Sequence, residues 1–312
     1  MIKKTLYFEN PAYLSLKNKQ LVVKLPEVER NDTLPDSFKA ETVRTIPVED
    51  VGIVILDNKQ ITLTHGLLTA LLENNAAVIH CNDSHHPVGM MLNLDGHSLQ
   101  TQRFKAQIEA SEPLKKQLWQ QTVVAKIENQ AAVLRLLGKD VKKLEFLSAN
   151  VKSGDSENCE ARAAAYYWGV LFEDYIPGFR REREGEPPNN LLNYGYAILR
   201  AAVARALVGS GLLPTLGIFH RNQYNAYCLA DDIMEPYRPF VDKEVLACVR
   251  DGEDFRELSK STKARLLMIM SQDTLFDKHR SPLMVGLTRT TASLSACFEG
   301  TRRKIVYPEL CV

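Results

Sequence analysis

The spacing of apolar residues changes once along this chain, and that change limits the fold more than any other feature. Before residue 95, short runs rich in β-branched residues are separated by turn signals such as Lys17-Asn18-Lys19, which is typical of short strands. From Leu99 onward, apolar positions recur at helical spacing over long segments. We therefore predict an α+β protein, with a β-rich, sandwich-like N-terminal domain over residues 1–95 and a larger all-α domain over residues 96–312.

The same patterns predict the individual elements. Strands are expected at residues 5–8, 13–16, 20–24, 43–47, 51–56 and 77–81. Helices are expected at residues 66–73, 113–137, 159–172, 191–208 and 243–250. Residues 26–39 are rich in charge and proline, and we expect an insertion or a loop there.

Composition is that of an ordinary globular protein. Of the 312 residues, 45% are hydrophobic and 25% are charged, which excludes disordered and collagen-like classes. No apolar run approaches the roughly twenty residues of a membrane span, and the first residues lack the apolar core of a signal peptide. We therefore expect a cytoplasmic protein with no membrane partner. The cysteines form no C-x-x-C pair, so we expect reduced thiols without a disulfide or structural zinc. They are Cys81, Cys159, Cys228, Cys248, Cys297 and Cys311.

One acidic residue stands on the apolar face of a predicted helix. Counting from Glu160, steps of three and seven residues reach Ala163 and Tyr167, so the carboxylate lies on the stripe that should face the core. No lysine or arginine shares that stripe, and a buried carboxylate must be paired, protonated or bound to a metal. A metal ion is a natural solution. Asp155 or Ser156 can cap this helix.

A second acidic group lies beside a histidine in residues 217–242. Asp231, Asp232 and Glu235 lie on or next to one short apolar helix that ends before a proline. Two carboxylates one turn apart repel each other unless they reach water, share a proton or bind a cation. Together with His220, this group suits a hard divalent metal ion.

A rival group of zinc-type ligands occurs earlier in the chain. His80, Cys81, Asp83, His85 and His86 crowd into seven residues. Their spacing matches no common zinc pattern, and the two adjacent histidines cannot easily both reach one ion. We therefore favour the later acidic group as the metal site.

Two motifs carry a resemblance to a known family. Residues 154–168 read G-D-x-x-N-x-E-A-R-A-A-x-Y-Y-W, and residues 220–239 read H-R-N-Q-Y-N-x-x-x-L-A-D-D-I-M-E-P-Y-R-P. With these motifs and the stretches at residues 7–23 and 46–57, the chain resembles the CRISPR-associated adaptation integrase, or Cas-one, family, and most of all its type II members. The resemblance runs through nearly the whole chain, and the long second motif is the specific one.

The resemblance implies a ligand set. Glu160, His220 and Glu235 match the residues that bind the metal and carry out catalysis in the family, with Mg²⁺ or Mn²⁺ as the ion. Many relatives have an aspartate at the third ligand position. Asp232 and, after it, Asp231 therefore remain alternatives to Glu235.

The resemblance also implies an activity and partners. The expected enzyme is a metal-dependent DNA endonuclease or integrase that inserts prespacer DNA into the CRISPR repeat through attack by a 3′-hydroxyl. Homodimers are expected through the N-terminal domain, with two dimers flanking a dimer of the Cas-two protein on double-stranded DNA. The same ligands would serve a structure-selective nuclease that acts on branched DNA. A non-catalytic DNA-binding scaffold is a further alternative, against which the intact ligand set argues.

Charge is distributed unevenly along the chain. The net charge is only +1, but residues 101–147 carry nine Lys or Arg against five acidic residues. Further basic clusters lie at residues 180–183 and 302–304. Each of these clusters is either a phosphate-binding surface or a solvated face.

Two segments near the motifs have open interpretations. Tyr224 would lie one turn after His220 if that segment is helical, and would then orient the histidine or pack. The charged loop at residues 180–186 is expected to be mobile and exposed, with Asn189 or Asn190 capping the helix that follows.

Overall fold

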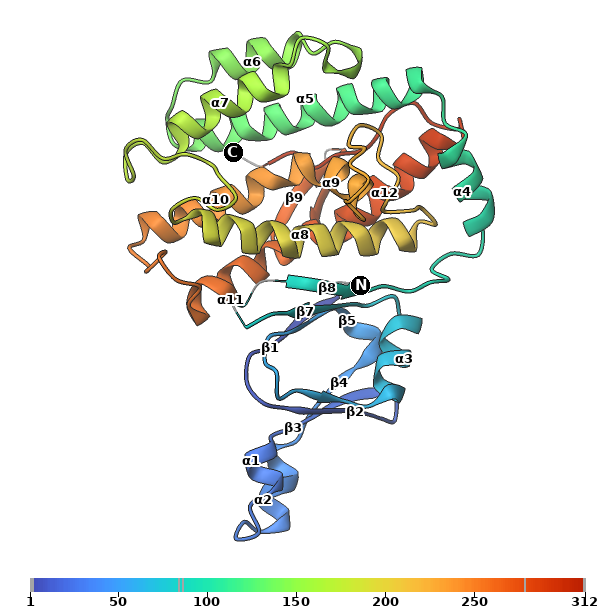
Figure 1. Cartoon of the computed structure of the whole chain (residues 1–312), viewed down its shortest axis with the longest axis vertical. Helices are drawn as coiled ribbons and strands as arrows, with labels where there is room; N and C mark the ends of the chain where they lie inside the picture. The colour runs from blue at the N-terminus through green and yellow to red at the C-terminus, as the bar shows by residue number, and fades with distance from the viewer. Residues whose placement is uncertain (1–2, 84, 86, 278, 311–312) are drawn as a thin grey trace. The chain divides into compact units, whose positions relative to one another are not determined.

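A computed structural model of the chain describes residues 3–83, 85, 87–277 and 279–310. It divides into two compact units, Met1–Gly96 and His97–Val312, and each is described by itself. Strands dominate the first unit and helices the second (Figure 1). The predicted α+β class is therefore confirmed.

Two four-stranded sheets form the first unit. Their orders are β1-β5-β7-β8 and β4-β3-β2-β6. In the first sheet, β5 is parallel to both β1 and β7, and β8 is antiparallel to β7. In the second, β3 is antiparallel to β2 and β4, while β6 is parallel to β2. The strands are β1 (Lys4–Phe8), β2 (Tyr13–Lys17), β3 (Gln20–Lys24), β4 (Arg44–Pro47), β5 (Val51–Leu56), β6 (Thr62–Leu63), β7 (Ala77–Cys81) and β8 (Pro87–Met91).

The core of the first unit draws on both sheets. Strand β5 is buried along its whole length, as its unbroken run of apolar residues requires. Leu21 from one sheet and Val54 and Val78 from the other belong to one apolar cluster. Helix α3 (His65–Glu73) adds Leu67 to this cluster and spans the two sheets on one side (Figure 1). This is the sandwich-like arrangement that the sequence predicts.

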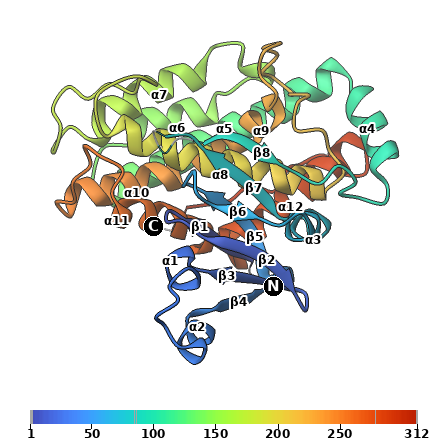
Figure 2. The same ribbon diagram turned by 60° about the horizontal axis from the view of Figure 1, so that its bottom comes forward.

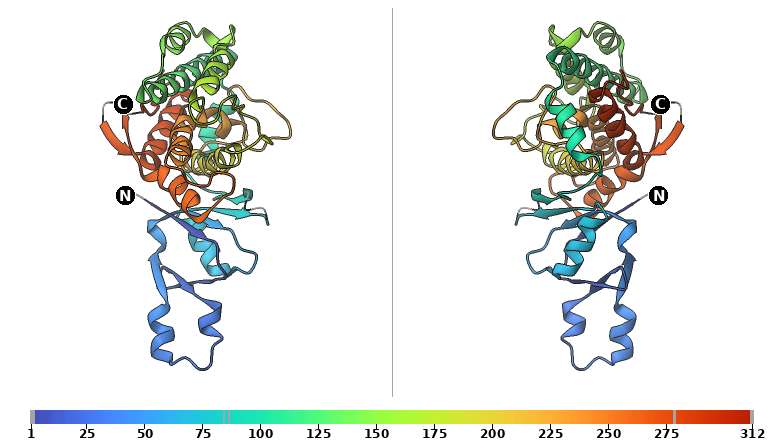
Figure 3. Two further views of the ribbon diagram at one scale, coloured as in Figure 1. Left: turned by 90° about the vertical axis from the view of Figure 1, so that its left-hand side faces the viewer. Right: turned by 90° about the vertical axis from the view of Figure 1, so that its right-hand side faces the viewer.

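The segment at residues 26–39, predicted as an insertion or a loop, contains helical turns that a loop would not have. It contains α1 (Pro26–Glu29) and the start of α2 (Asp36–Thr42), which project together beyond β3 and β4 (Figure 3). Pro26 opens α1 at a position where a helix needs no N–H donor, so proline starts the helix here. The sequence patterns also missed the short β6 and the strand β8.

The second unit is a helical assembly with one small hairpin. Strands β9 (Asp273–Phe276) and β10 (His279–Pro282) pair antiparallel at its edge (Figure 3), so the predicted all-α domain is not purely helical. The helices are α4 (Gln100–Ile108), α5 (Glu112–Leu136), α6 (Lys142–Ala149), α7 (Cys159–Leu171), α8 (Asn189–Gly209), α9 (Cys228–Met234), α10 (Arg238–Arg250), α11 (Lys260–Met268) and α12 (Leu283–Phe298). Short 3₁₀ turns are η1 (Val48–Asp50) in the first unit and η2 (Ser153–Asp155), η3 (Glu235–Tyr237) and η4 (Ile269–Ser271) in the second.

Helix α8 lies at the centre of the second unit (Figure 2), where it packs against α9, α10, α11 and α12. Among the described residues it is the one helix long and apolar enough to cross a membrane, a feature that the count of uninterrupted apolar residues overlooked. However, 78% of its apolar window is buried inside the protein. Such burial is the pattern of a core helix.

The described end of the chain is fastened to α5 and η3 through one buried amide. The Nδ2 atom of Asn129 donates to the carbonyl oxygens of Pro236 at 2.8 Å and Pro308 at 2.9 Å. Its Oδ1 atom accepts from the backbone N–H of Leu310 at 2.9 Å. Because these three bonds join separate segments, Asn129 sets the position of the turn that carries Glu235.

Candidate active site

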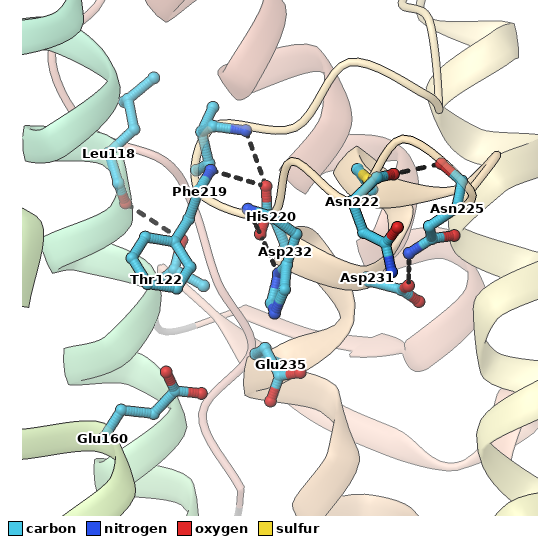
Figure 4. Close-up of polar contacts among 12 residues, drawn as sticks. Leu118, Thr122, Glu160, Phe219, His220, Asn222, Asn225, Asp231, Asp232 and Glu235 are labelled. Atoms are coloured by element: carbon cyan, nitrogen blue, oxygen red, sulfur yellow. Dashed lines mark hydrogen bonds and ion pairs between the residues drawn. The ribbon is translucent and has the colours of Figure 1, made fainter. Parts of the chain in front are cut away.

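Glu160 lies in the first turn of α7, where local hydrogen bonds fix the start of the helix. The carboxylate of Asp155 accepts from the backbone N–H groups of Cys159 at 2.8 Å and Glu160 at 3.0 Å. The expected cap is therefore supplied by Asp155 and not by Ser156, although the residue at the N-cap position itself is Asn158. This arrangement leaves the Glu160 side chain free to point away from its own helix (Figure 4).

The neutralising cation missing from the Glu160 stripe comes from another helix. Lys126 on α5 places its Nζ atom 2.6 Å from Oε1 of Glu160 and 2.5 Å from Oε2 of Glu235. The side chain of Lys126 is only 11% exposed. Burial lowers the pKa of this lysine, but the two carboxylates outweigh that effect and raise it, so the ammonium stays charged. The stripe of Glu160 itself has no lysine or arginine, as the sequence indicates, and the cationic partner comes from α5, which a search of one helix does not reveal.

His220 is held by a carboxylate clamp. The two oxygens of Asp232 accept from the backbone N–H groups of Ile218 at 2.7 Å, Phe219 at 3.0 Å and His220 at 3.1 Å. Oδ1 also lies 2.5 Å from Nδ1 of the His220 ring. Because an ionised carboxylate can only accept, Nδ1 donates to it, and in the neutral imidazole Nε2 then keeps its lone pair.

The clamp explains the electrostatics and the packing of this loop. The hydrogen bond to Asp232 raises the pKa of His220 in the metal-free protein, against the opposing effect of burial. Phe219 stacks on Trp119 with ring centroids 4.2 Å apart, and the His220 ring meets Trp119 edge-on at 5.8 Å. The backbone at Gly217 passes so close that an added Cβ would stand 2.4 Å from the His220 carbonyl oxygen.

Glu235 opens η3, directly after α9 ends at Met234. Its side chain is buried, and Arg238 one turn later donates from Nε to Oε1 at 2.8 Å. Burial raises the pKa of Glu235, but Arg238 and Lys126 outweigh it and hold the pKa at about 2. The other oxygen, Oε2, lies 2.5 Å from the ammonium nitrogen of Lys126.

The two alternative ligands have other partners. Asp231 accepts from Nε of Arg200 at 2.6 Å and from Nδ2 of Asn225 at 2.7 Å. Asp232 is fully buried and fully used by the His220 clamp. Figure 4 shows Asp231 turned toward Asn225, while Glu160, His220 and Glu235 face one common space.

The donor set of that space fits a divalent cation. It offers two carboxylates and one imidazole Nε2, with Asp232 as the hydrogen-bonded partner that orients the imidazole. In the described part of the chain no three such side chains already stand at coordinating distance. The ammonium of Lys126 lies between Glu160 and Glu235 and contacts both carboxylates.

Comparisons with known proteins decide the family. The family model described as "CRISPR associated protein Cas1" matches residues 6–269. The CRISPR-associated endonuclease Cas1 of Neisseria meningitidis serogroup C (strain 8013) is 35% identical over 298 residues, which cover 95% of this chain and 92% of that protein. The chain belongs to the Cas1 family. The resemblance seen in the sequence motifs is thereby confirmed, and so is the expectation of an enzyme of the CRISPR nuclease and integrase class.

Two solved structures are similar to the Cas1 fold seen here. A casposase bound to integration product superposes with a TM-score of 0.77 at 19% identity, covering 98% of this chain and 92% of that one. A Cas6-RT-Cas1–Cas2 complex superposes with a TM-score of 0.73 at 20% identity, covering 99% of this chain and 36% of that one. At these identities the similarity concerns the fold alone.

Sequence reasoning missed two cationic residues of this candidate site, Lys126 and Arg238. The signal for Lys126 was present, since it follows Trp119 by seven residues and Thr122 by four, both buried on the same face of α5. It was counted instead among the surface charges of residues 101–147. Arg238 lies three residues after Glu235, which is the spacing of neighbours on a helical turn.

A buried network behind the Cas1 site was also missed. The carboxylate of Asp242 accepts from the hydroxyls of Tyr167 at 3.1 Å and Tyr196. Burial raises the pKa of Asp242 to about 7, although both hydroxyls lower it. The guanidinium of Arg238 lies over the Tyr196 ring at 4.5 Å, so this network adjoins the arginine that binds Glu235.

Of the expectations near the motifs, the role of Tyr224 was wrong, whereas the 180–186 loop is largely exposed as expected. Tyr224 is 87% exposed and the residues from 217 to 227 form no helix, so it neither orients His220 nor packs. The loop at residues 180–186 is tied down by Asn189, whose Nδ2 donates to the carbonyls of Arg180 and Glu186 at 2.9 and 2.8 Å. Asn189 therefore fastens this loop instead of capping α8.

The rival zinc group forms no cluster among its described members. Within it, His85 instead contacts Asp57, with 2.9 Å between Nδ1 and Oδ1, and His86 lies outside the described residues. The described cysteines are free thiols, as the sequence predicts, and Cys311 also lies outside the described residues.

Proposed function

We propose that this Cas1 chain is the integrase of CRISPR adaptation, and that it joins the 3′ ends of a short prespacer DNA to the CRISPR repeat. The observation that carries this proposal is the convergence of Glu160, His220 and Glu235 on one space from three separate elements. Family membership supports the reaction class, and the donor set supports metal dependence.

The chain's own residues would divide the work as follows. Glu160, Glu235 and Nε2 of His220 would hold Mg²⁺ or Mn²⁺. Asp232 would keep the His220 proton on Nδ1, and Arg238 would hold the carboxylate of Glu235 in place. Once bound, the ion polarises the phosphate and favours the deprotonated form of the attacking hydroxyl.

The bond changes define the product. The 3′-hydroxyl oxygen of the prespacer forms a bond to a phosphorus atom of the repeat and loses its proton. The bond from that phosphorus to the 3′ oxygen of the neighbouring nucleotide breaks, and this oxygen takes up a proton. If water attacks in place of the hydroxyl, the same residues produce a nick. A structure-selective nuclease is therefore the second candidate, and the name of the Neisseria meningitidis relative, an endonuclease, favours nuclease activity.

The proposed assembly supplies two active sites. Joining both ends of a prespacer requires two attacks one repeat apart, which a single subunit cannot supply. We propose homodimers formed through the N-terminal unit, two of which flank a Cas2 dimer in the cytoplasm. The solved complex that contains Cas1 with Cas2 supports Cas2 as a partner, and the casposase bound to integration product supports DNA as a partner.

Strand transfer tests the proposal directly. A labelled prespacer is incubated with Cas2, Mn²⁺ or Mg²⁺ and a plasmid that bears the leader and repeat, with wild type, His220→Ala and His65→Ala compared. His65 is an exposed residue of α3 and provides a matched control. We expect joined product at the repeat borders with wild type and the control, and none with His220→Ala.

The other outcomes separate the alternatives. Metal-dependent cleavage without joining would favour the nuclease. Joining that survives His220→Ala would place the active site elsewhere. A non-catalytic scaffold would give no joining with wild type and no response to metal.

A further inference from the structure

Lys126 holds a central position between the two proposed carboxylate ligands. It comes from the middle of α5, whereas Glu160 comes from α7 and Glu235 from η3. Its Nζ atom lies 2.6 Å from Glu160 and 2.5 Å from Glu235, and its side chain is 89% buried. A buried ammonium with two carboxylates at such short distances is a strongly held ion.

The charges of this cluster cancel in the metal-free protein. Glu160 and Glu235 carry two negative charges, and Lys126 and Arg238 carry two positive ones. Arg238 is bonded to Oε1 of Glu235, so the ammonium of Lys126 is the cation beside Oε2. If a divalent cation joined this set, the local charge would rise from zero to plus two.

A metal ion and the Lys126 ammonium cannot occupy the same position between Glu160 and Glu235. Mg²⁺ binds carboxylate oxygens at about 2.0–2.1 Å, so an ion held by Oε1 of Glu160 and Oε2 of Glu235 would need the position between these two atoms. The ammonium now lies between the same two oxygens at comparable distance. Two cations cannot share that position, because at contact distance their repulsion is several kcal/mol or more at protein dielectric constants.

We propose that Lys126 is an internal counter-cation of the active site, which a divalent metal must displace from Glu160 and Glu235 in order to bind. This inference rests on the proposed function for the identity of the ligands. Lys126 holds the two carboxylates together while the site is empty and lowers the affinity of the site for metal. It is a positioning residue whose effect is measured in metal binding as well as in strand transfer.

The test measures Mn²⁺ affinity and thermal unfolding on the full chain. Free Mn²⁺ is followed by its paramagnetic resonance signal, and unfolding is followed with chelator and with saturating Mn²⁺. We compare wild type with Lys126→Met, which keeps the length of the side chain and removes its charge, and with Lys126→Arg, which keeps the charge. Lys139→Met is the matched control. Lys139 forms an ion pair with Asp174, with 2.7 Å between Nζ and Oδ1, and neither residue is a proposed ligand.

Displacement predicts a specific pattern. Lys126→Met should bind Mn²⁺ at least about tenfold more tightly than wild type, because no cation has to leave. In chelator it should unfold about 5 °C or more below wild type, since Glu160 loses the ammonium as its ionic partner and Glu235 keeps only Arg238, and Mn²⁺ should restore most of that loss. Lys126→Arg and Lys139→Met should stay within about threefold of the wild-type affinity.

A further variant separates failure of this inference from failure of the proposed function. Glu160→Gln should lose Mn²⁺ binding if the ligand assignment holds. If Glu160→Gln loses binding but Lys126→Met binds Mn²⁺ no more tightly than wild type, the displacement is wrong and the site stands. If wild type and Glu160→Gln bind Mn²⁺ equally, both the ligand assignment and the displacement are overturned. If Lys126→Met does not fold in chelator, Lys126→Arg decides. Mn²⁺ affinity equal to wild type in this variant, which retains the charge, supports the displacement, and tighter Mn²⁺ binding overturns it.

Discussion

Asp232 is the residue whose role the structure changes most, and Asp232→Asn tests that role. In the wild type, its four acceptor contacts hold the backbone of residues 218–220 and the ring of His220. The amide of asparagine keeps one oxygen and replaces the other by an NH₂ group, which only donates. If the oxygen stays on Ile218 and Phe219, the NH₂ group faces both N–H donors of His220.

The substitution therefore forces the histidine to change its tautomer. Nδ1 must become an acceptor for the new NH₂ group, so the ring proton moves to Nε2, the atom proposed to bind the metal. One charge-assisted bond is lost at about 1.5–3 kcal/mol, and one backbone N–H is left unpaired at about 1–3 kcal/mol. We expect a total loss of about 3–5 kcal/mol of folding free energy and a melting temperature lower by roughly 8–15 °C.

The decisive measurement is metal affinity at a temperature where the variant is folded. Loss of a partner that orients a metal-binding histidine typically costs 10–100-fold in affinity, and we expect that range for Mn²⁺. Asp231→Asn is the matched control, because the same chemical change falls on the Arg200 and Asn225 contacts. If Asp231→Asn weakens Mn²⁺ binding as much as Asp232→Asn, or if neither does, the clamp argument is refuted.

Three further predictions concern residues around the site. The pKa of Asp242 is raised to about 7, so its ionisation costs no folding free energy below pH 4 and lowers the unfolding free energy of the wild type as pH rises to about 7. Asp242→Asn should therefore gain up to about 4 kcal/mol over wild type between pH 4 and pH 8 in denaturant unfolding. A pH-independent difference would contradict this. Gly217→Ala should weaken Mn²⁺ binding at least about tenfold, because its Cβ would stand 2.7 Å from Oδ2 of Asp232, whereas Gly169→Ala, with open space, should not. Asn129→Ala should lower the unfolding free energy by about 2–4 kcal/mol, since three buried backbone groups lose their partner, and an unchanged denaturation midpoint would show that water replaces the amide.

Local patterns predicted six of the eight strands described in the first unit, but not the helices α4, α6, α11 and α12 of the second. Strands β3, β5 and β7 agree with the sequence prediction at both ends. Strand β8 was missed because Pro87 and Gly89 weaken its strand propensity, and its pairing with β7 decides its conformation. The helices α1 and α2 were missed because proline and charge were interpreted as loop signals, although proline also opens helices.

The sequence predicted the candidate site only in part. Amphipathic spacing placed Glu160 on a core-facing stripe, and the motifs singled out His220 and Glu235, which the structure brings to one space. The choice among Asp231, Asp232 and Glu235 was beyond the sequence, because all three lie within five residues and differ only in what they contact. Those contacts come from α8, from the 217–220 loop and from α5, which are distant along the chain.

The sequence alone determined the α+β class, the family and two of the residues proposed as ligands, Glu160 and His220, with three candidates for the third, since helical period, strand alternation and motif are all properties of neighbouring residues. Only the tertiary structure decided how those residues are held. Lys126 is 34 residues from Glu160 and joins it to Glu235 only because α5, α7 and η3 pack together. Electrostatic pairing depends on distance in space, which residue spacing within one helix does not report.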